Sequence, residues 1–180
     1  MDNNKTNKKK LFVKILVPVL IAVTLIIIWA VKTRPTPTPI DEQNGYIADF
    51  VLEATSIDLD ALKDYKLPII IDFGADSCDP CKAMAPVLVK MNGEMQGRAI
   101  IKFVDVWKNP DAANDFPIQL IPTQVFINAD GTPYVQSDDI GVKFDMYSLK
   151  ETGEHAFTVH QGMLTEKEMR AILADMGVAE

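Results

Sequence analysis

Residues 68–91, PIIIDFGADSCDPCKAMAPVLVKM, carry the strongest structural signal in the chain. The run PIIIDF is apolar apart from one acid, which is typical of a central strand in a parallel sheet. After the two cysteines, apolar residues recur three and four positions apart and predict a helix. These residues are Met84, Val87, Leu88, Met91 and Met95. The segment therefore predicts a strand and a helix joined by a turn that holds both cysteines.

The flanking sequence extends this unit into an alternating pattern of strands and helices. Asp58 is a suitable N-cap for a helix that runs to Lys66 and that Pro68 stops. Near the C-terminus, Thr165 and Glu168 form a T-x-x-E capping box ahead of an apolar helix face. Strands are also predicted at 46–53, 99–106 and 123–128, and a short helix at 111–116. This order predicts an α/β fold with a mixed central sheet flanked by helices.

Residues 134–155 do not follow the alternating pattern. Two turn signals, at 129–131 and at 152–153, could each close a hairpin before the last helix. We interpret the segment as an insertion that supplies one extra strand or a long loop.

Residues 11–31, LFVKILVPVLIAVTLIIIWAV, form a separate hydrophobic segment with one charge, Lys14. Its length matches a hydrocarbon core of about 30 Å, so we predict one N-terminal transmembrane helix. Four lysines in the basic tail, residues 1–10, place the N-terminus in the cytoplasm and the rest outside. The alternative is a cleaved signal peptide, but the run is longer than usual and no A-x-A site follows it. We therefore expect a single-pass protein of the cytoplasmic membrane.

The remaining sequence is a linker followed by one globular domain. Residues 32–44 are rich in proline and threonine, which predicts an extended spacer. Residues 45–180 have the length of a single domain. The net charge of −7 combines +6 in residues 1–34 with −13 in the rest. A domain this acidic repels phosphate backbones, so the composition argues against nucleic-acid binding.

Cys78 and Cys81 are the only cysteines, so a scaffold held together by several disulfides is excluded. At the start of a helix, free backbone N–H groups and the helix dipole stabilise a thiolate on the first cysteine. Cys78 is therefore expected to attack a disulfide, and Cys81 to resolve the mixed disulfide.

Two non-catalytic interpretations of the cysteine pair stay open. A zinc or copper site would need ligands such as His155 and His160, which lie far along the chain. A purely structural disulfide is disfavoured, because so small a loop restrains little of the unfolded chain. We predict no metal site.

Together with residues 108–128, KNPDAANDFPIQLIPTQVFIN, the cysteine segment resembles the thioredoxin family. The matching features are an acid six residues before the first cysteine, the pattern C-x-P-C-K, a proline five residues after the second cysteine, and a downstream Ile-Pro-Thr. The resemblance implies a thioredoxin fold across residues 68–128, extended to about residue 176 by the last helix. It also implies that the redox-active disulfide is the only cofactor.

The resemblance assigns a role to each matching position. Cys78 corresponds to the nucleophile and Cys81 to the resolving cysteine. Asp72 corresponds to a buried acid that assists proton transfer at Cys81, and its burial should raise its pKa. Pro122 corresponds to a cis-proline beside the disulfide, and Pro86 to a helix-kinking proline. Substrate contacts are expected from Asp79, Pro80, Ile121 and Pro122.

Several positions depart from the family pattern. Gly74 and Ser77 stand where tryptophans are usual, and Phe103 stands where a lysine commonly neighbours the buried acid. Lys102 is adjacent to Phe103, but alternation along a strand places it on the opposite face. Asp72 is therefore expected to lack its usual cation.

The charges beside the cysteines predict the direction of the reaction. Asp79 replaces a glycine within the motif, and with Asp76 it flanks Cys78. Their negative charge should raise the pKa of Cys78 and favour the disulfide form, which makes the pair a reductant.

The sequence thus predicts an extracytoplasmic thiol–disulfide oxidoreductase that reduces disulfides in exported proteins. The resemblance implies recharging by a membrane electron carrier of the cytochrome c biogenesis type, in a bacterial cell, and we expect a monomer. The alternatives are a disulfide-forming oxidase, and a binding module whose cysteines hold metal or stabilise a loop.

Overall fold

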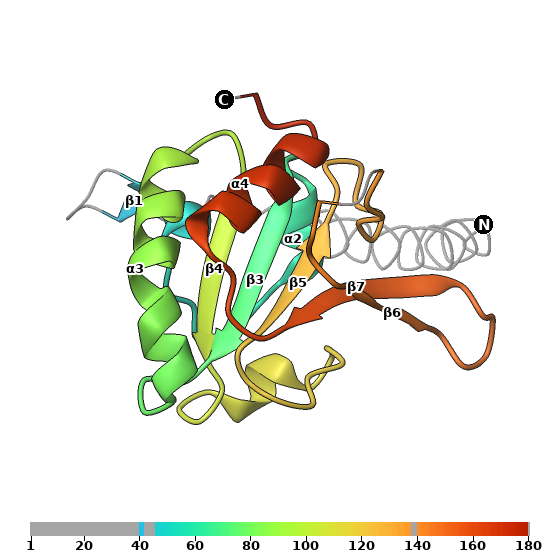
Figure 1. Ribbon diagram of the computed structural model, residues 1–180, viewed down its shortest axis with the longest axis horizontal. Helices are drawn as coiled ribbons and strands as arrows, with labels where there is room; N and C mark the ends of the chain where they lie inside the picture. The colour runs from blue at the N-terminus through green and yellow to red at the C-terminus, as the bar shows by residue number, and fades with distance from the viewer. Residues whose placement is uncertain (1–39, 42–45, 138–139, 180) are drawn as a thin grey trace, which may run out of the picture. The chain divides into compact units, whose positions relative to one another are not determined.

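The computed structural model describes residues 40–41, 46–137 and 140–179 (Figure 1). The predicted basic tail and transmembrane helix, residues 1–31, lie outside the described residues. So does the predicted linker, apart from residues 40–41. No helix of the described part is long and apolar enough to cross a membrane.

The cysteine segment forms the two elements that its pattern predicts. Strand β3 (Ile69–Gly74) is buried along its whole length, and helix α3 (Asp79–Glu94) follows after a four-residue turn. Helix α3 returns the chain to strand β4 (Ile100–Asp105), which pairs parallel with β3. This is the right geometry for a βαβ unit, because a parallel pair needs a long crossover connection.

The described residues hold a five-stranded sheet with the order β4-β3-β5-β7-β6. Strand β5 (Thr123–Ile127) pairs antiparallel with β3, and β7 (His155–Gln161) pairs antiparallel with β5. Strand β6 (Asp145–Ser148) adds to the outer edge of β7. A short separate pair is formed by β1 (Ile40–Asp41) and β2 (Tyr46–Ile47). The predicted mixed sheet is confirmed.

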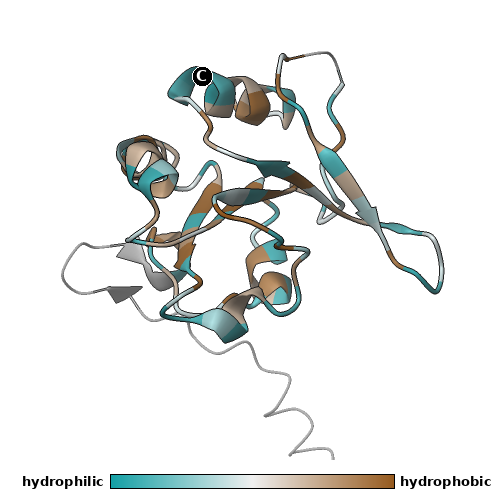
Figure 2. Ribbon diagram, turned by 60° about the horizontal axis from the view of Figure 1, so that its bottom comes forward, coloured by the Kyte–Doolittle hydropathy of each residue, from teal (hydrophilic) through white to brown (hydrophobic). Residues whose placement is uncertain are grey.

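Helices cover both faces of the large sheet (Figure 1). On one face, α3 and α4 (Glu166–Asp175) pack on a core that includes Ile70, Met84 and Ile172. On the other face, the 3₁₀ helix η1 (Ala48–Phe50), helix α2 (Leu59–Lys63) and the 3₁₀ helix η2 (Pro110–Ala113) enclose a second core. Figure 2 shows hydrophobic residues gathered in the central strands between these layers.

The N-terminal strand predicted at residues 46–53 is much shorter in the structure. After β2 and η1, the chain makes only a single parallel bridge, between Glu53 and Phe103. Side chains supply hydrogen bonds where regular strand pairing is missing. Asn92 and Gln96 donate to the carbonyl oxygen of Phe50, and Lys102 donates to that of Val51. Hydrogen bonds from α3, from Gln96 just after it and from β4 therefore hold this segment.

Two predicted helices are also shorter than expected. Asp58 caps α2, as predicted, but α2 ends at Lys63, and Lys66 adopts a left-handed φ of 55°. The helix predicted at 111–116 is the 3₁₀ helix η2, which starts at Pro110. Both turns proposed for the hairpin are used. The first spans 128–132, and the second joins β6 to β7, so residues 134–155 contain both a loop and an extra strand.

Replacing Thr165 tests the capping box, which the structure confirms. Thr165 Oγ1 accepts from the backbone N–H of Glu168, and the Glu168 carboxylate accepts from the N–H of Thr165. We expect Thr165→Ala to lower the free energy of unfolding by about 1 kcal/mol in urea titrations. The exposed neighbour Lys167→Ala is the control and should change it by less than about 0.5 kcal/mol. Equal effects of both changes would contradict a specific role for the cap.

Candidate active site

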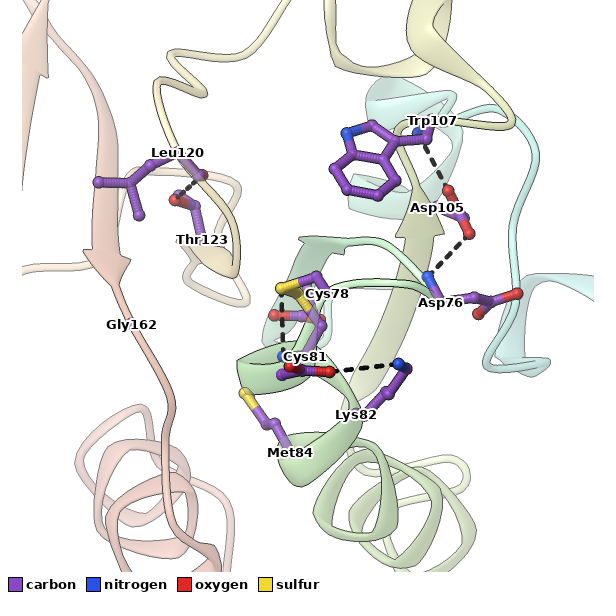
Figure 3. Close-up of a disulfide and its surroundings, with 12 residues drawn as sticks. Asp76, Cys78, Cys81, Lys82, Met84, Asp105, Trp107, Leu120, Thr123 and Gly162 are labelled. Carbon is purple, nitrogen blue, oxygen red and sulfur yellow. Dashed lines mark hydrogen bonds and ion pairs between the residues drawn. A yellow bond between two sulfur atoms is a disulfide. The ribbon is translucent and has the colours of Figure 1, made fainter.

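Cys78 and Cys81 form a disulfide at the N-terminus of α3 (Figure 3). Cys78 is the N-cap residue, and its Sγ accepts a hydrogen bond from the backbone N–H of Cys81 at 3.4 Å. The same N–H group and the helix dipole would stabilise a thiolate on Cys78 after reduction.

The two sulfurs differ in accessibility. Cys81 is 4% exposed, whereas Cys78 is only partly buried. A pocket of about 250 Å³ reaches Cys81 between α3 and β4, and Leu52, Ala75 and Phe103 help to line it. Cys78 is therefore the more exposed sulfur of the pair, although this pocket also reaches Cys81.

Asp105, at the end of β4, anchors the turn that leads into the cysteines. One of its carboxylate oxygens accepts from the backbone N–H of Asp76, and the other from those of Trp107 and Lys108, all at 3.0–3.1 Å. Burial opposes its ionisation, but these hydrogen bonds outweigh it and hold the pKa of Asp105 below its usual value. The carboxylate ties the β3–α3 turn to the β4–η2 loop.

The acids that flank Cys78 are both paired with lysines. Asp76 forms an ion pair with Lys108, and Asp79 lies 3.3 Å from Lys82 Nζ. The sequence places these acids beside Cys78 but does not place Lys108, which belongs to another loop. Each negative charge has a positive partner, so the two acids should destabilise a Cys78 thiolate less than the sequence predicts. The ion pairs therefore weaken the prediction that these acids make the cysteine pair a reductant.

Asp72 is fully buried in the middle of β3, as expected. Desolvation raises the pKa of Asp72 to about 7, although a hydrogen bond from Gln124 opposes this shift. Phe103 lies opposite Asp72 on β4, and Lys102 pairs with Ile71, on the other face of the sheet. No cation contributes to the shift, so the expectation that Asp72 lacks its usual partner holds for the described residues.

Because Gly74 has no side chain, it leaves a space next to both Asp72 and Cys81. A Cβ at residue 74 would lie 3.4 Å from Asp72 Oδ2, 3.3 Å from Cys81 Sγ and 2.9 Å from a ring carbon of Phe103. A larger residue at position 74 would therefore collide with Phe103 and crowd both reactive groups.

Figure 3 shows Leu120 and Thr123, from the loop before β5 and its first residue, to the left of the disulfide and Trp107 to its right. The Ile121–Pro122 peptide bond is cis, as the resemblance implies. Thr123 Oγ1 donates to the carbonyl oxygen of Leu120 at 2.7 Å and closes the loop. Pro122 is buried and Ile121 is partly buried, whereas Leu120 is 47% exposed and Trp107 is 64% exposed.

The structure brings most of the predicted site residues to this end of the sheet. Asp79 and Pro80 are exposed in the first turn of α3, beside the disulfide. Among the described residues, no group of three or more His, Cys, Asp and Glu side chains could hold a metal ion.

Sequence reasoning missed three residues of the site, namely Asp105, Trp107 and Gln124. A signal existed for Gln124, because it is the only amide in the buried run TQVFI, residues 123–127. The roles of Asp105 and Trp107 depend on the folding of a loop, which residue spacing does not indicate.

Comparisons with known proteins give a consistent result. A family model described as Thioredoxin matches residues 52–144. Thioredoxin 1 of Chlorobaculum tepidum is 44% identical over 63 residues, which is 35% of this chain and 62% of that protein. A thioredoxin of Staphylococcus epidermidis is 35% identical over 83 residues, which is 46% of this chain and 78% of that protein. This chain thus matches less than two thirds of the Chlorobaculum protein.

A similar chain among solved structures is chloroplastic thioredoxin z, described with a type-specific mode of target recognition. It is 24% identical, with a TM-score of 0.49, and the match covers 72% of this chain and 96% of that one.

Replacing Asp72 by asparagine tests its buried carboxyl group. The folded protein holds this proton up to about pH 7, whereas an unfolded carboxyl group loses it near pH 3.9, so Asp72 lowers stability as pH rises between these values. We expect oxidised Asp72→Asn to be more stable than the wild type at pH 8, by up to about 4 kcal/mol. This difference in the free energy of unfolding between the variant and the wild type should vanish near pH 4. Urea unfolding across this pH range measures it.

The exposed Asp115→Asn serves as the control and should show no such pH-dependent gap. A gap for Asp72→Asn that stays constant from pH 4 to pH 8 would contradict the raised pKa.

Proposed function

Because the chain belongs to the thioredoxin family, we propose that it is a thiol–disulfide oxidoreductase acting through Cys78 and Cys81. One observation carries this proposal: a partly exposed sulfur at a helix N-terminus is joined to a buried sulfur close to a buried acid. A structural disulfide requires neither the difference in exposure nor the acid.

The proposed reduction of a client disulfide has two steps. The Cys78 thiolate attacks one client sulfur, the client disulfide breaks, and the other client sulfur leaves as a thiolate that takes a proton from water. Asp72 then accepts the proton of the Cys81 thiol, and the Cys81 thiolate attacks Cys78 Sγ. The Cys78–Cys81 disulfide forms, and the second client sulfur is released as a thiolate. The protein loses two electrons and the client gains them.

The surface around Cys78 supports protein clients. Trp107 and Leu120 are exposed on two sides of the disulfide (Figure 3). Exposed aromatic and aliphatic side chains beside a reactive sulfur favour an extended apolar segment of a protein over a small charged thiol. Asp79, Pro80, Ile121 and Pro122 would contribute the nearby contacts.

We also propose that this domain lies outside the cytoplasm, held by a membrane anchor at residues 11–31. The hydrophobic run and the lysines before it support this topology. The clients would then be exported proteins, and a membrane electron carrier of the cytochrome c biogenesis type would return the pair to the dithiol. The domain would work as a monomer, without metal and without nucleic acid.

The reverse direction, disulfide formation, is the second candidate. The observation that favours it is the pairing of Asp76 with Lys108 and of Asp79 with Lys82, which removes an obstacle to a stable Cys78 thiolate. A stable thiolate makes a cysteine pair oxidising.

The reduction potential of the full-length protein in detergent, measured against glutathione, distinguishes these candidates. We expect a value near −270 mV, roughly that of thioredoxin. A value near −120 mV, roughly that of the oxidant DsbA, would reverse the direction. Failure to exchange with any dithiol would contradict both and leave a binding module.

Trapping tests the order of attack and the location of the site together. Cys81→Ser leaves Cys78 without its resolving partner, so mixed disulfides with clients should accumulate in cells, detectable on non-reducing gels. A membrane-impermeant maleimide should label the untrapped Cys78 in spheroplasts. The control is the double variant Cys78→Ser/Cys81→Ser, which should give neither signal. No trapped client would argue against protein substrates, and labelling only after lysis would argue against an extracytoplasmic domain.

A further inference from the structure

The Gln124 side chain joins the buried acid to the loop beside the disulfide. Gln124 is fully buried and lies directly opposite Asp72 in the β3–β5 register. Its Nε2 donates to Asp72 Oδ1 at 2.7 Å and to the carbonyl oxygen of Gly162 at 3.1 Å. A third contact places Nε2 at 3.5 Å from Met84 Sδ on α3. One amide group therefore links two strands, a helix and a loop.

Gly162 continues this connection to the cis-proline loop. Its backbone N–H donates to the carbonyl oxygen of Pro122 at 2.9 Å. Gly162 lies on the same side of the disulfide as Leu120 and Thr123 (Figure 3). Hydrogen bonds therefore run from Pro122 through Gly162 and Gln124 to Asp72.

The two oxygens of the Asp72 carboxyl group have different surroundings. Oδ1 accepts from Gln124, whereas Oδ2 is buried without a hydrogen-bond partner. Oδ2 is also the oxygen near the space above Gly74, because a Cβ there would lie 3.4 Å from Oδ2 and 3.3 Å from Cys81 Sγ. A buried acceptor without a partner is costly, and proton acceptance from Cys81 would use it.

We propose that Gln124 is a positioning residue that holds Asp72 with Oδ2 toward Cys81 and ties this orientation to the Pro122–Gly162 contact. This inference rests on the proposed function. It assigns Gln124 to the second step alone: the proton passes from Cys81 Sγ to Asp72 Oδ2, the Cys78–Cys81 bond forms, and the client thiolate leaves. The attack by Cys78 does not use Asp72, so it should depend on Gln124 only weakly, through the Gly162–Pro122 contact.

Few titratable groups face Asp72 besides Cys81, which lies on α3. On β4 the facing residue is Phe103, and on β7 His160 lies in register with Gln124, with Nδ1 bonded to the carbonyl oxygen of Lys143. On α4, Glu168 interacts with His160 and caps the helix. Gln124 therefore contributes the only hydrogen bond that the described residues direct at the Asp72 carboxylate.

Gln124→Met tests the proposal, because methionine has nearly the same length but no amide group. In the Cys81→Ser background, the rate of mixed-disulfide formation with a model client should stay within about twofold. With Cys81 present, release of the client should slow by about tenfold, the effect of losing one hydrogen bond to a charged group. The pH midpoint of this release should also rise, because Gln124 lowers the pKa of Asp72.

A second variant and a matched control complete the experiment. Gln124→Asn keeps an amide group on a shorter side chain, so it should slow client release and raise its pH midpoint by smaller amounts. This variant also tests the proposal if Gln124→Met does not fold. The exposed Glu151→Met, in the turn between β6 and β7, should behave as the wild type. Equal slowing of both steps, or an unmoved pH midpoint, would overturn the positioning role. Failure of the wild type to form mixed disulfides would instead overturn the proposed function.

Discussion

The site depends on the junction at which strand β3 ends and helix α3 begins. The strand carries a carboxyl group into the centre of the sheet, and the helix presents unpaired N–H groups to the first cysteine a few residues later. Asp105 holds the turn between them through three backbone hydrogen bonds. Because one short turn separates the acid from both sulfurs, its geometry determines whether they can exchange protons.

The cysteines and the acid at this junction differ in how deeply they are buried. Cys78 keeps enough exposure to meet a large partner, while Cys81 and Asp72 are withdrawn from water. In such surroundings a carboxyl group retains its proton to about pH 7, so it can exchange a proton with a thiol under ordinary conditions. The same burial destabilises the folded protein when the carboxyl group ionises, so Asp72 lowers stability above about pH 7.

Acids that look unpaired in the sequence form ion pairs with lysines in the folded protein. Four side chains near the reactive pair, Asp76, Asp79, Lys82 and Lys108, form two ion pairs on its surface. Exposed pairs of this kind add little stability, but each places a positive charge beside the acid and so reduces the field that an isolated acid would impose on a thiolate. The acids beside Cys78 are therefore a weaker guide to the stability of its thiolate than their place in the sequence suggests.

The sequence alone determined the elements with strong local signals. The apolar run of β3, the spacing of apolar residues in α3 and the capping box of α4 depend on neighbours within a few residues, and each was predicted correctly. The position of the cysteine pair at a helix N-terminus was equally accessible, as was the cis bond before Pro122, through resemblance. Tertiary structure decided what depends on contacts between distant residues. It paired Lys108 with Asp76, placed Gln124 opposite Asp72, shortened the segment at 46–53, and used residues 134–155 for both a loop and a strand. These outcomes depend on which side chains meet across the sheet, and periodicity along the chain carries no information about such meetings.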